Sequence, residues 1–280
     1  MTVVNTPEQA LACFDDALPL IIVDGDAACV PGSPDLDGAR VALASLELAV
    51  GLAIGGAVEG VVTGPVSKAQ LHAVGFRHPG QTEYVAERCG IAPTGAAMML
   101  AAPVLRVVPI TTHIALNEVA ATLTSSLIMS RVRTTVRGLL KYWGIAEPYL
   151  ALAALNPHAG EGGAMGREEI DIFEPALDAL RAEGVSIDGP VPADAVFTPR
   201  RRALYDAILC PTHDQALIPF KALHVDEGVN ITLGLSIVRT SADHGTAFDI
   251  AGLDQADAGA TVAALRLAAS AAACRRRFAS

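Results

Sequence analysis

The sequence lacks the features of several large classes of protein. It has no excess of positive charge, since 20 Lys and Arg residues face 30 Asp and Glu residues, so a broad nucleic-acid-binding surface is not expected. No apolar run approaches the roughly 20 residues that span a bilayer. Residues 1–8 also lack the basic stretch and apolar core of a secretory leader. We therefore expect a soluble, cytoplasmic protein that binds neither nucleic acid nor membrane.

Paired cysteines are also absent. The chain has five cysteines, an odd number, and none has the spacing of a zinc-binding or redox pair. A disulfide framework is not expected, and the pattern suits a reducing compartment. Each thiol is expected to act as a small buried apolar group. The five are Cys13, Cys29, Cys89, Cys210 and Cys274.

Neither an internal repeat nor a long polar linker interrupts the chain. Short apolar runs alternate with longer helical patterns, which predicts an α/β protein with a largely parallel sheet. With 280 residues and 51% hydrophobic content, the chain can bury a large core. Helices are expected at residues 34–54, started by Ser33, and at 117–142, 167–183 and 258–278. Strands are expected at residues 60–63, 105–112, 149–155 and 207–211.

Three histidines follow three of the predicted strands. They are His113, His158 and His213, separated by 45 and 55 residues, so only the fold can unite them. Ligands of open α/β sheets bind at the carboxyl ends of strands. One histidine in such a place is usually structural, but three could meet at a divalent ion and leave an open position, as in catalytic metal sites. Zinc, cobalt or nickel suits three imidazoles, and magnesium would need added waters.

Other polar segments near the strand ends allow both a functional and a plain interpretation. The loop at residues 64–68 could cradle an anion, although a turn explains it equally well. The glycine-rich loop at 156–163 carries Asn, His and Glu, which favours a function over a simple connection. Lys221 and Arg239 could bind phosphate or carboxylate, or could be solvated surface charges. No Gly-x-Gly-x-x-Gly follows a strand, so a nicotinamide cofactor would need a non-Rossmann site.

Eight stretches stand in the order and spacing of one known family. They read VTGPVSK (62–68), HPGQTE (78–83), TTH (111–113), LNPHAGEGG (155–163), GPVPAD (189–194), HDQ (213–215), GVNITLGL (228–235) and RTSADHGTA (239–247). Together they resemble the 4-hydroxythreonine-4-phosphate dehydrogenase family of pyridoxal phosphate biosynthesis. The resemblance runs from about Pro31 to near the carboxyl terminus.

This resemblance implies an isocitrate/isopropylmalate-dehydrogenase-like fold with two α/β/α lobes around a cleft. The lobes would comprise residues 1–75 with 228–280, and residues 76–227. It also implies a homodimer whose active sites lie at the subunit interface, and NAD or NADP as cofactor. A divalent metal, Zn, Mg or Co, would be held by three histidines drawn from both partners, which map to His113, His158 and His213.

The resemblance also implies the residues that hold the small phosphorylated substrate. Lys221 is in addition the candidate acid or base, provided that burial or a neighbouring cation makes it less basic. Residues 244–252 resemble the cofactor loop of the wider superfamily, which makes Gly245 and Asp249 candidates for cofactor binding. The expected substrate-binding residues are Gln81, Thr82, Lys221, Asn230 and Arg239.

Two departures from the family stand out. Gln81 occupies a position where the family usually has histidine; an amide can donate a hydrogen bond but cannot carry a proton charge. The family's opening strand and Gly-Glu-Pro-Ala-Gly-Ile-Gly-Pro loop have no counterpart before Pro31. Either the true start lies upstream, or the strand is replaced, for example by residues 20–24.

The expected activity is metal-dependent oxidation of 4-phosphohydroxy-L-threonine by NAD(P), followed by decarboxylation to 3-amino-2-oxopropyl phosphate. Because of Gln81, a paralogous dehydrogenase for a four-carbon sugar-acid phosphate or a dihydrodiol dicarboxylate is the main alternative. A metal hydrolase would need no nicotinamide. An acyl transferase of the phosphate acetyltransferase type would need coenzyme A and no metal. A non-catalytic binding module is the last alternative.

Overall fold

The computed structural model describes residues 1–25, 30–92 and 94–279. The strands are β1 Thr2–Val3, β2 Pro19–Leu20, β3 Gly60–Thr63, β4 Ala97–Ala102, β5 Leu105–Pro109, β6 Tyr149–Ala153, β7 Ser186–Val191, β8 Ala207–Cys210, β9 Val229–Leu233 and β10 Val238–Ala242. The α-helices are α1 Pro7–Cys13, α2 Leu36–Ile54, α3 Lys68–Ala73, α4 Gln81–Arg88, α5 Val119–Thr122, α6 Ser125–Trp143, α7 Glu174–Ala182, α8 Ala193–Val196, α9 Pro199–Arg202, α10 His213–His224 and α11 Gly259–Ala279. Shorter helical turns are η1 Leu116–Glu118, η2 Pro157–Gly163, η3 Glu169–Phe173 and η4 Phe248–Ile250.

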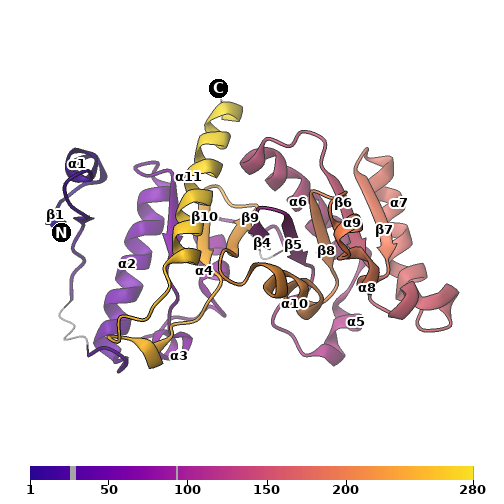
Figure 1. Cartoon of the computed structure of the whole chain (residues 1–280), viewed down its shortest axis with the longest axis horizontal. Coiled ribbons are helices and arrows are strands. Elements are labelled where there is room, and N and C mark those ends of the chain that lie inside the picture. Colours follow the sequence, from indigo (N-terminus) through magenta and orange to yellow (C-terminus); the bar gives the residue numbers. More distant parts are fainter. Residues whose placement is uncertain (26–29, 93, 280) are drawn as a thin grey trace.

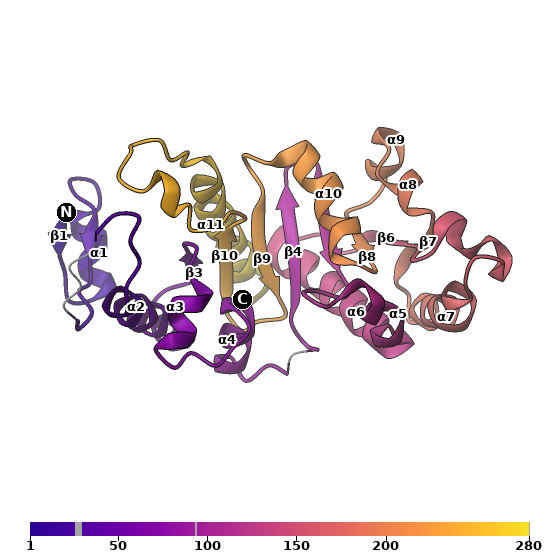
Figure 2. The same cartoon turned by 90° about the horizontal axis from the view of Figure 1, so that it is seen from below.

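One eight-stranded sheet organises the molecule. Its strand order is β3-β10-β9-β4-β5-β8-β6-β7, and this order follows the long axis of the molecule from α2 to α7 (Figures 1 and 2). β10 pairs with β3, β8 with β5 and β6, and β7 with β6 in parallel, whereas β9 and β4 make antiparallel pairs. The predicted α/β class with a mostly parallel sheet is confirmed. The sheet runs unbroken through both predicted lobes, and the lobe boundaries stay a prediction.

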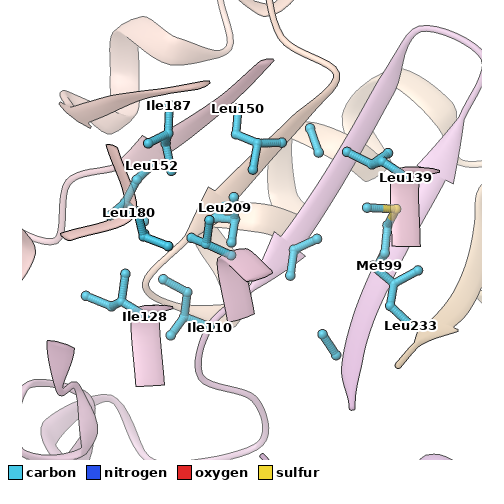
Figure 3. Close-up of a cluster of buried hydrophobic side chains, with 14 of the residues drawn as sticks. Met99, Ile110, Ile128, Leu139, Leu150, Leu152, Leu180, Ile187, Leu209 and Leu233 are labelled. Carbon is cyan, nitrogen blue, oxygen red and sulfur yellow. The ribbon is translucent and has the colours of Figure 1, made fainter. Parts of the chain in front are cut away.

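The two faces of the sheet bury two separate hydrophobic clusters. Side chains alternate between faces along a strand, so Met99 faces one cluster and Leu100 the other. The Met99 side is covered by α6, α7 and α11, and the Leu100 side by α10. Figure 3 shows Met99 among the buried side chains of the first cluster. A third cluster lies between α2 and the β3 end of the sheet. The second face is only partly covered, which leaves room for a cleft beside α10.

Three predicted helices begin or continue differently from expectation. The first begins at Leu36 because Asp35, and not Ser33, caps it by accepting from the Gly38 amide at 2.7 Å. The helix predicted at residues 117–142 is broken before α6, where Thr124 is extended and caps the Leu127 amide. The helix predicted at 167–183 opens with the π-helical turn η3 before α7. The helix predicted at 258–278 closely matches α11.

The amino-terminal segment does not replace a strand of the main sheet. Of the residues 20–24 proposed for that role, only Leu20 lies in a strand, and it pairs with Val3 of β1 in a separate two-stranded sheet. That part of the prediction is wrong. Pairing with β1 closes a short loop and therefore costs less chain entropy than pairing with β3, some 40 residues further along the chain.

Two smaller findings concern cysteines and apolar helices. The four cysteines that the structure describes are free; Cys210 is buried and the other three are partly exposed. Cys29 lies outside the described residues. Among the described helices, none combines the length and apolarity needed to cross a bilayer. The cytoplasmic location stays a prediction of the sequence.

Close packing of α6 on β9 gives a stability prediction. A Cβ at Gly138 of α6 would lie 2.9 Å from Leu233 Cδ2, whereas a Cβ at Gly51 of α2 would meet nothing within 4 Å. Alanine improves helix propensity equally at both positions. We expect Gly138→Ala to be less stable than Gly51→Ala by about 1–3 kcal/mol because of overpacking. Urea unfolding of both variants measures this difference, and equal stabilities would contradict it.

Candidate active site

A cleft of about 1020 Å³ lies on the sheet face beside α10. Its floor comes from β4, β9 and β10, and its walls come from the loops after β3, β5, β8 and β10. β3 and β5 run in opposite directions, so their carboxyl ends lie at opposite edges of the sheet. Both ends border the cleft because the cleft extends across the sheet. The expectation that all site loops leave one edge is therefore too simple.

The alternation of β9 and β10 decides which residues face the cleft. Ile231 and Val238 belong to the hydrophobic core behind the sheet. Their neighbours Asn230 and Arg239 face the other way and line the cleft. One residue of register shift in either strand would send these polar groups into the core.

Arg239 is a buried charge without a carboxylate partner among the described residues. Its side chain is 3% exposed, and its guanidinium donates to Thr63 Oγ1 at 2.9 Å, to Thr82 Oγ1 at 3.4 Å and to Gln81 Oε1 at 3.4 Å. Desolvation lowers the pKa of Arg239 to about 10, although Glu83 acts to raise it. The guanidinium thus stays charged at neutral pH, and a buried charge with only neutral partners is suited to bind an anion.

Gln81 and Thr82 are the first residues of α4, and the structure brings both to Arg239. The Gln81 amide donates from Nε2 to the Gly64 carbonyl at 3.1 Å while its Oε1 accepts from Arg239. A protonated histidine at this position could not accept that hydrogen bond. Glutamine therefore links the loop after β3 to the buried guanidinium without adding a second positive charge.

His113 and His213 meet because their strands are parallel neighbours. The β5–β8 ladder continues past the strands through Ile110 and Thr111, whose Oγ1 donates to the Pro211 carbonyl at 2.6 Å. The two imidazole centroids are 5.6 Å apart. His213 Nδ1 lies 2.8 Å from Asp214 Oδ1, which leaves Nε2 free to bind a ligand. Desolvation, and then Lys68 and His213, lower the pKa of His113, which favours the neutral imidazole that a metal requires.

His158 is not brought to the other two histidines. It is exposed, lies in the turn η2 after β6 and does not line the cleft. Within the described residues, no group of three His, Cys, Asp or Glu side chains is close enough to hold a metal. The described part of one chain therefore brings two of the three predicted ligands together.

Lys221 and Asn230 both line the cleft. Lys221 Nζ lies 3.2 Å from Asp243 Oδ2, and 47% of its side chain is exposed. From the sequence, the acid–base role of Lys221 depends on burial or a neighbouring cation. That condition is not met, since Lys221 is half exposed and its neighbour Asp243 is a carboxylate. The Asn230 Oδ1 atom is buried and accepts no hydrogen bond from the residues that the structure describes. It is therefore an acceptor available to a bound molecule.

The structure adds three residues that the sequence did not single out, although Lys68 belongs to the loop at 64–68 that could cradle an anion. Asp243 pairs with Lys221, and Lys68 and Glu83 line the cleft. Lys68 acts to lower the pKa of His113, whereas Glu83 acts to raise the pKa of both His113 and Arg239. All three lie in the motif stretches, but residue type alone does not separate them from surface charges.

The predicted cofactor loop borders a second cavity of about 380 Å³. Thr246, Phe248 and Ala251 line it together with the start of α2, and Pro65 and Val66 line both cavities. The two spaces are therefore adjacent. Gly245 lines the main cleft, whereas Asp249 is an exposed residue of η4.

Because Arg239 has no carboxylate partner among the described residues, we expect its replacement to abolish anion binding without lowering the unfolding free energy of the protein. We expect Arg239→Met to keep the unfolding free energy within about 1 kcal/mol of the wild type or to raise it, because an apolar side chain avoids the cost of burying a charge. Inorganic phosphate should raise the Tm of the wild type and leave that of the variant unchanged. Thermal unfolding with and without phosphate tests this. A variant that phosphate still stabilises would show that Arg239 does not bind the anion.

Comparison with known sequences gives a family match. The chain matches the profile of the family described as "Pyridoxal phosphate biosynthetic protein PdxA" over residues 1–268, which includes the segment before Pro31. A 4-hydroxythreonine-4-phosphate dehydrogenase of Zymomonas mobilis is 53% identical over 276 residues, which cover 99% of this chain and 82% of the relative.

Solved structures give a consistent result. A 4-hydroxythreonine-4-phosphate dehydrogenase from Klebsiella pneumoniae superposes with a TM-score of 0.84 at 35% identity, covering 97% of this chain and 82% of that one. A terephthalate 1,2-cis-dihydrodiol dehydrogenase from Burkholderia xenovorans superposes with a TM-score of 0.68 at 30% identity, covering 96% and 83%. The chain is thus more similar to the first of these two enzymes.

Proposed function

The chain belongs to the PdxA family of pyridoxal phosphate biosynthetic proteins, and on that premise we propose that its main cleft oxidises 4-phosphohydroxy-L-threonine. A bound nicotinamide cofactor would supply the hydride acceptor for the carbon that carries the hydroxyl group, and the hydroxyl proton passes to a base. The resulting β-keto acid loses carbon dioxide, and its electron pair remains as an enolate that takes up a proton. The products are 3-amino-2-oxopropyl phosphate, carbon dioxide and the reduced cofactor.

The observation that carries this proposal is the buried guanidinium of Arg239 in the same cleft as the His113–His213 pair. A phosphate accepts hydrogen bonds in the fork geometry that a guanidinium offers. Thr82 and Gln81, already in contact with Arg239, complete the proposed phosphate site. The unpartnered Asn230 Oδ1 accepts from a donor group of the substrate.

Lys221 is the proposed proton carrier. As an ammonium beside Asp243, it donates a proton to the enolate carbon after decarboxylation. The amine left by that donation, and not one formed by burial or a neighbouring cation, accepts the hydroxyl proton of the next substrate. Asp243 holds the ammonium toward the cleft between these steps. A lysine suits this role because its flexible stem can move a proton between two neighbouring atoms.

The residues at the end of β5 and β8 suit a divalent metal, Zn, Mg or Co. His113 and His213 supply imidazole nitrogens, and Asp214 orients His213 from behind, as carboxylates do in metal sites. When bound, the metal stabilises negative charge on the substrate oxygens. We propose that His158 of a second copy supplies the third nitrogen, which makes the enzyme a homodimer with its sites at the interface. The exposure of His158 and its absence from the described lining of the cleft in its own chain support this arrangement.

The second cavity is the proposed place of the nicotinamide cofactor, with Gly245 and Asp249 on its loop. Its position next to the main cleft supports hydride transfer between them. Of the described residues that line it, none is Lys or Arg, and Asp35 contributes a carboxylate. A 2′-phosphate would meet negative charge there without a cationic partner, which favours NAD over NADP.

The paralogous dihydrodiol dehydrogenase reaction is less well supported. The Burkholderia xenovorans enzyme is less similar to this chain than the Klebsiella pneumoniae enzyme by both identity and superposition. Gln81, which raised this alternative, makes hydrogen bonds compatible with the phosphate site.

Turnover tests the proposal directly. Purified protein with 4-phosphohydroxy-L-threonine and NAD is expected to form NADH, faster than with NADP, and to stop when a chelator removes the metal. Arg239→Met should lose turnover through a higher KM. His158→Ala should lower turnover by at least roughly 100-fold. Even the loss of a residue that only hydrogen-bonds to a metal ligand can cost that much activity. Absence of NADH with every metal tested would contradict the proposal.

Mixing inactive variants tests whether His158 acts across the interface. A dimer of one His158→Ala and one His213→Ala subunit would keep one intact site and lose the other. Random subunit exchange should therefore restore about a quarter of wild-type activity. Activity that stays at zero while exchange is confirmed by native mass spectrometry would place all three ligands in one subunit.

A further inference from the structure

The backbone that carries His158 adopts an unusual left-handed turn. From His158 to Gly162 the φ angles are 51°, 54°, 77°, 45° and 65°. Three of these five residues are not glycine, and the left-handed region is unfavourable for L-residues with a Cβ. Such a turn persists only where its surroundings fix it.

Glu169 of η3 fixes the entry to this turn. Its side chain is 1% exposed. Oε1 accepts from the Leu155 amide at 2.9 Å and from the Asn156 amide at 2.8 Å, and Oε2 accepts from Asn156 Nδ2 at 2.9 Å. A buried carboxylate is costly unless its oxygens are hydrogen-bonded, so these three donors and Glu169 depend on one another.

The turn packs directly on this carboxylate. A Cβ at Gly160 would lie 2.9 Å from Glu169 Oε2, and a Cβ at Gly166 would clash with Asn156 Nδ2. Neither position has room for a side chain. The glycines of the loop thus serve close approach to Glu169 and Asn156 in addition to conformational freedom.

We propose that Glu169 is a positioning residue that holds the left-handed turn in the shape that presents His158 to its metal. This inference rests on the proposed function, which makes His158 a metal ligand. The carboxylate reaches the histidine through the backbone of residues 155–158 and does not touch the substrate.

The charge state of Glu169 matters because all three of its partners are donors. In Glu169→Gln, one oxygen becomes an NH2 group that faces a donor. The Asn156 side-chain amide can relieve this clash by flipping. In the wild type, however, Glu168 Oε2 accepts from Asn156 Nδ2 at 2.7 Å, and after the flip it would face Asn156 Oδ1 instead. A second change, Glu168→Gln, supplies a donor at that point. The double variant should therefore recover what the single variant loses.

The test uses the intact protein with Co²⁺ as the probe, whose visible absorption reports the ligand set. Glu169→Gln is expected to weaken Co²⁺ affinity about 10-fold or more and to alter the Co²⁺ spectrum, and Glu168→Gln/Glu169→Gln to regain most of the affinity. Asp171→Asn is the matched control, since it removes a nearby carboxylate whose ion pair with Arg167 is exposed. It should change the affinity less than twofold.

Hydrogen exchange provides a readout without metal. The Leu155 and Asn156 amides should exchange faster in Glu169→Gln than in the wild type or Asp171→Asn. Unchanged exchange, or unchanged Co²⁺ affinity in Glu169→Gln while His158→Ala weakens it, would overturn the role of Glu169. If His158→Ala itself leaves Co²⁺ affinity unchanged, the ligand assignment in the proposed function fails, and the role given to Glu169 fails with it.

Discussion

The guanidinium of Arg239 places a positive charge in the floor of the cleft, and the described part of the chain offers it only hydroxyl and amide oxygens. This arrangement requires β10 to keep its register, since a shift by one residue would exchange Arg239 with Val238 or Thr240. It also requires α4 to begin at Gln81, so that its first two side chains reach the guanidinium. The substrate proposal depends on this single buried charge, because an anion is the partner that it lacks.

The opposite end of the cleft depends on sheet topology. His113 and His213 lie more than 90 residues apart in the sequence, yet they meet because β5 and β8 are adjacent and parallel. β6 is the next strand after β8, but its loop turns away into the left-handed conformation that Glu169 supports. The same sheet therefore gathers two histidines within a subunit and directs the third outward, as a site shared between two copies would need.

Much of the fold followed from local patterns in the sequence. β3 coincides with the predicted strand 60–63, and the other three predicted strands end one to three residues earlier than expected. The breaks between helices were missed because they depend on caps. Thr124 stops one helical pattern through its own hydrogen bond to a backbone amide, which an apolar periodicity does not reveal. The strands β4, β7, β9 and β10 were also missed. β4 consists of Ala, Met and Leu, which favour helices over strands, so its residue types do not indicate a strand.

The sequence by itself determined the α/β class, the family and the identity of the polar residues available to a site. These follow from residue type, spacing and motif order, which are properties of the chain without its fold. Only the tertiary structure decided that Arg239 is buried without a carboxylate partner among the described residues, and that Lys221 pairs with Asp243. It also decided that Glu169 supports the His158 turn, and that His158 lies apart from the other two histidines. Burial and pairing depend on which segments become neighbours, and that is set by strand order and register.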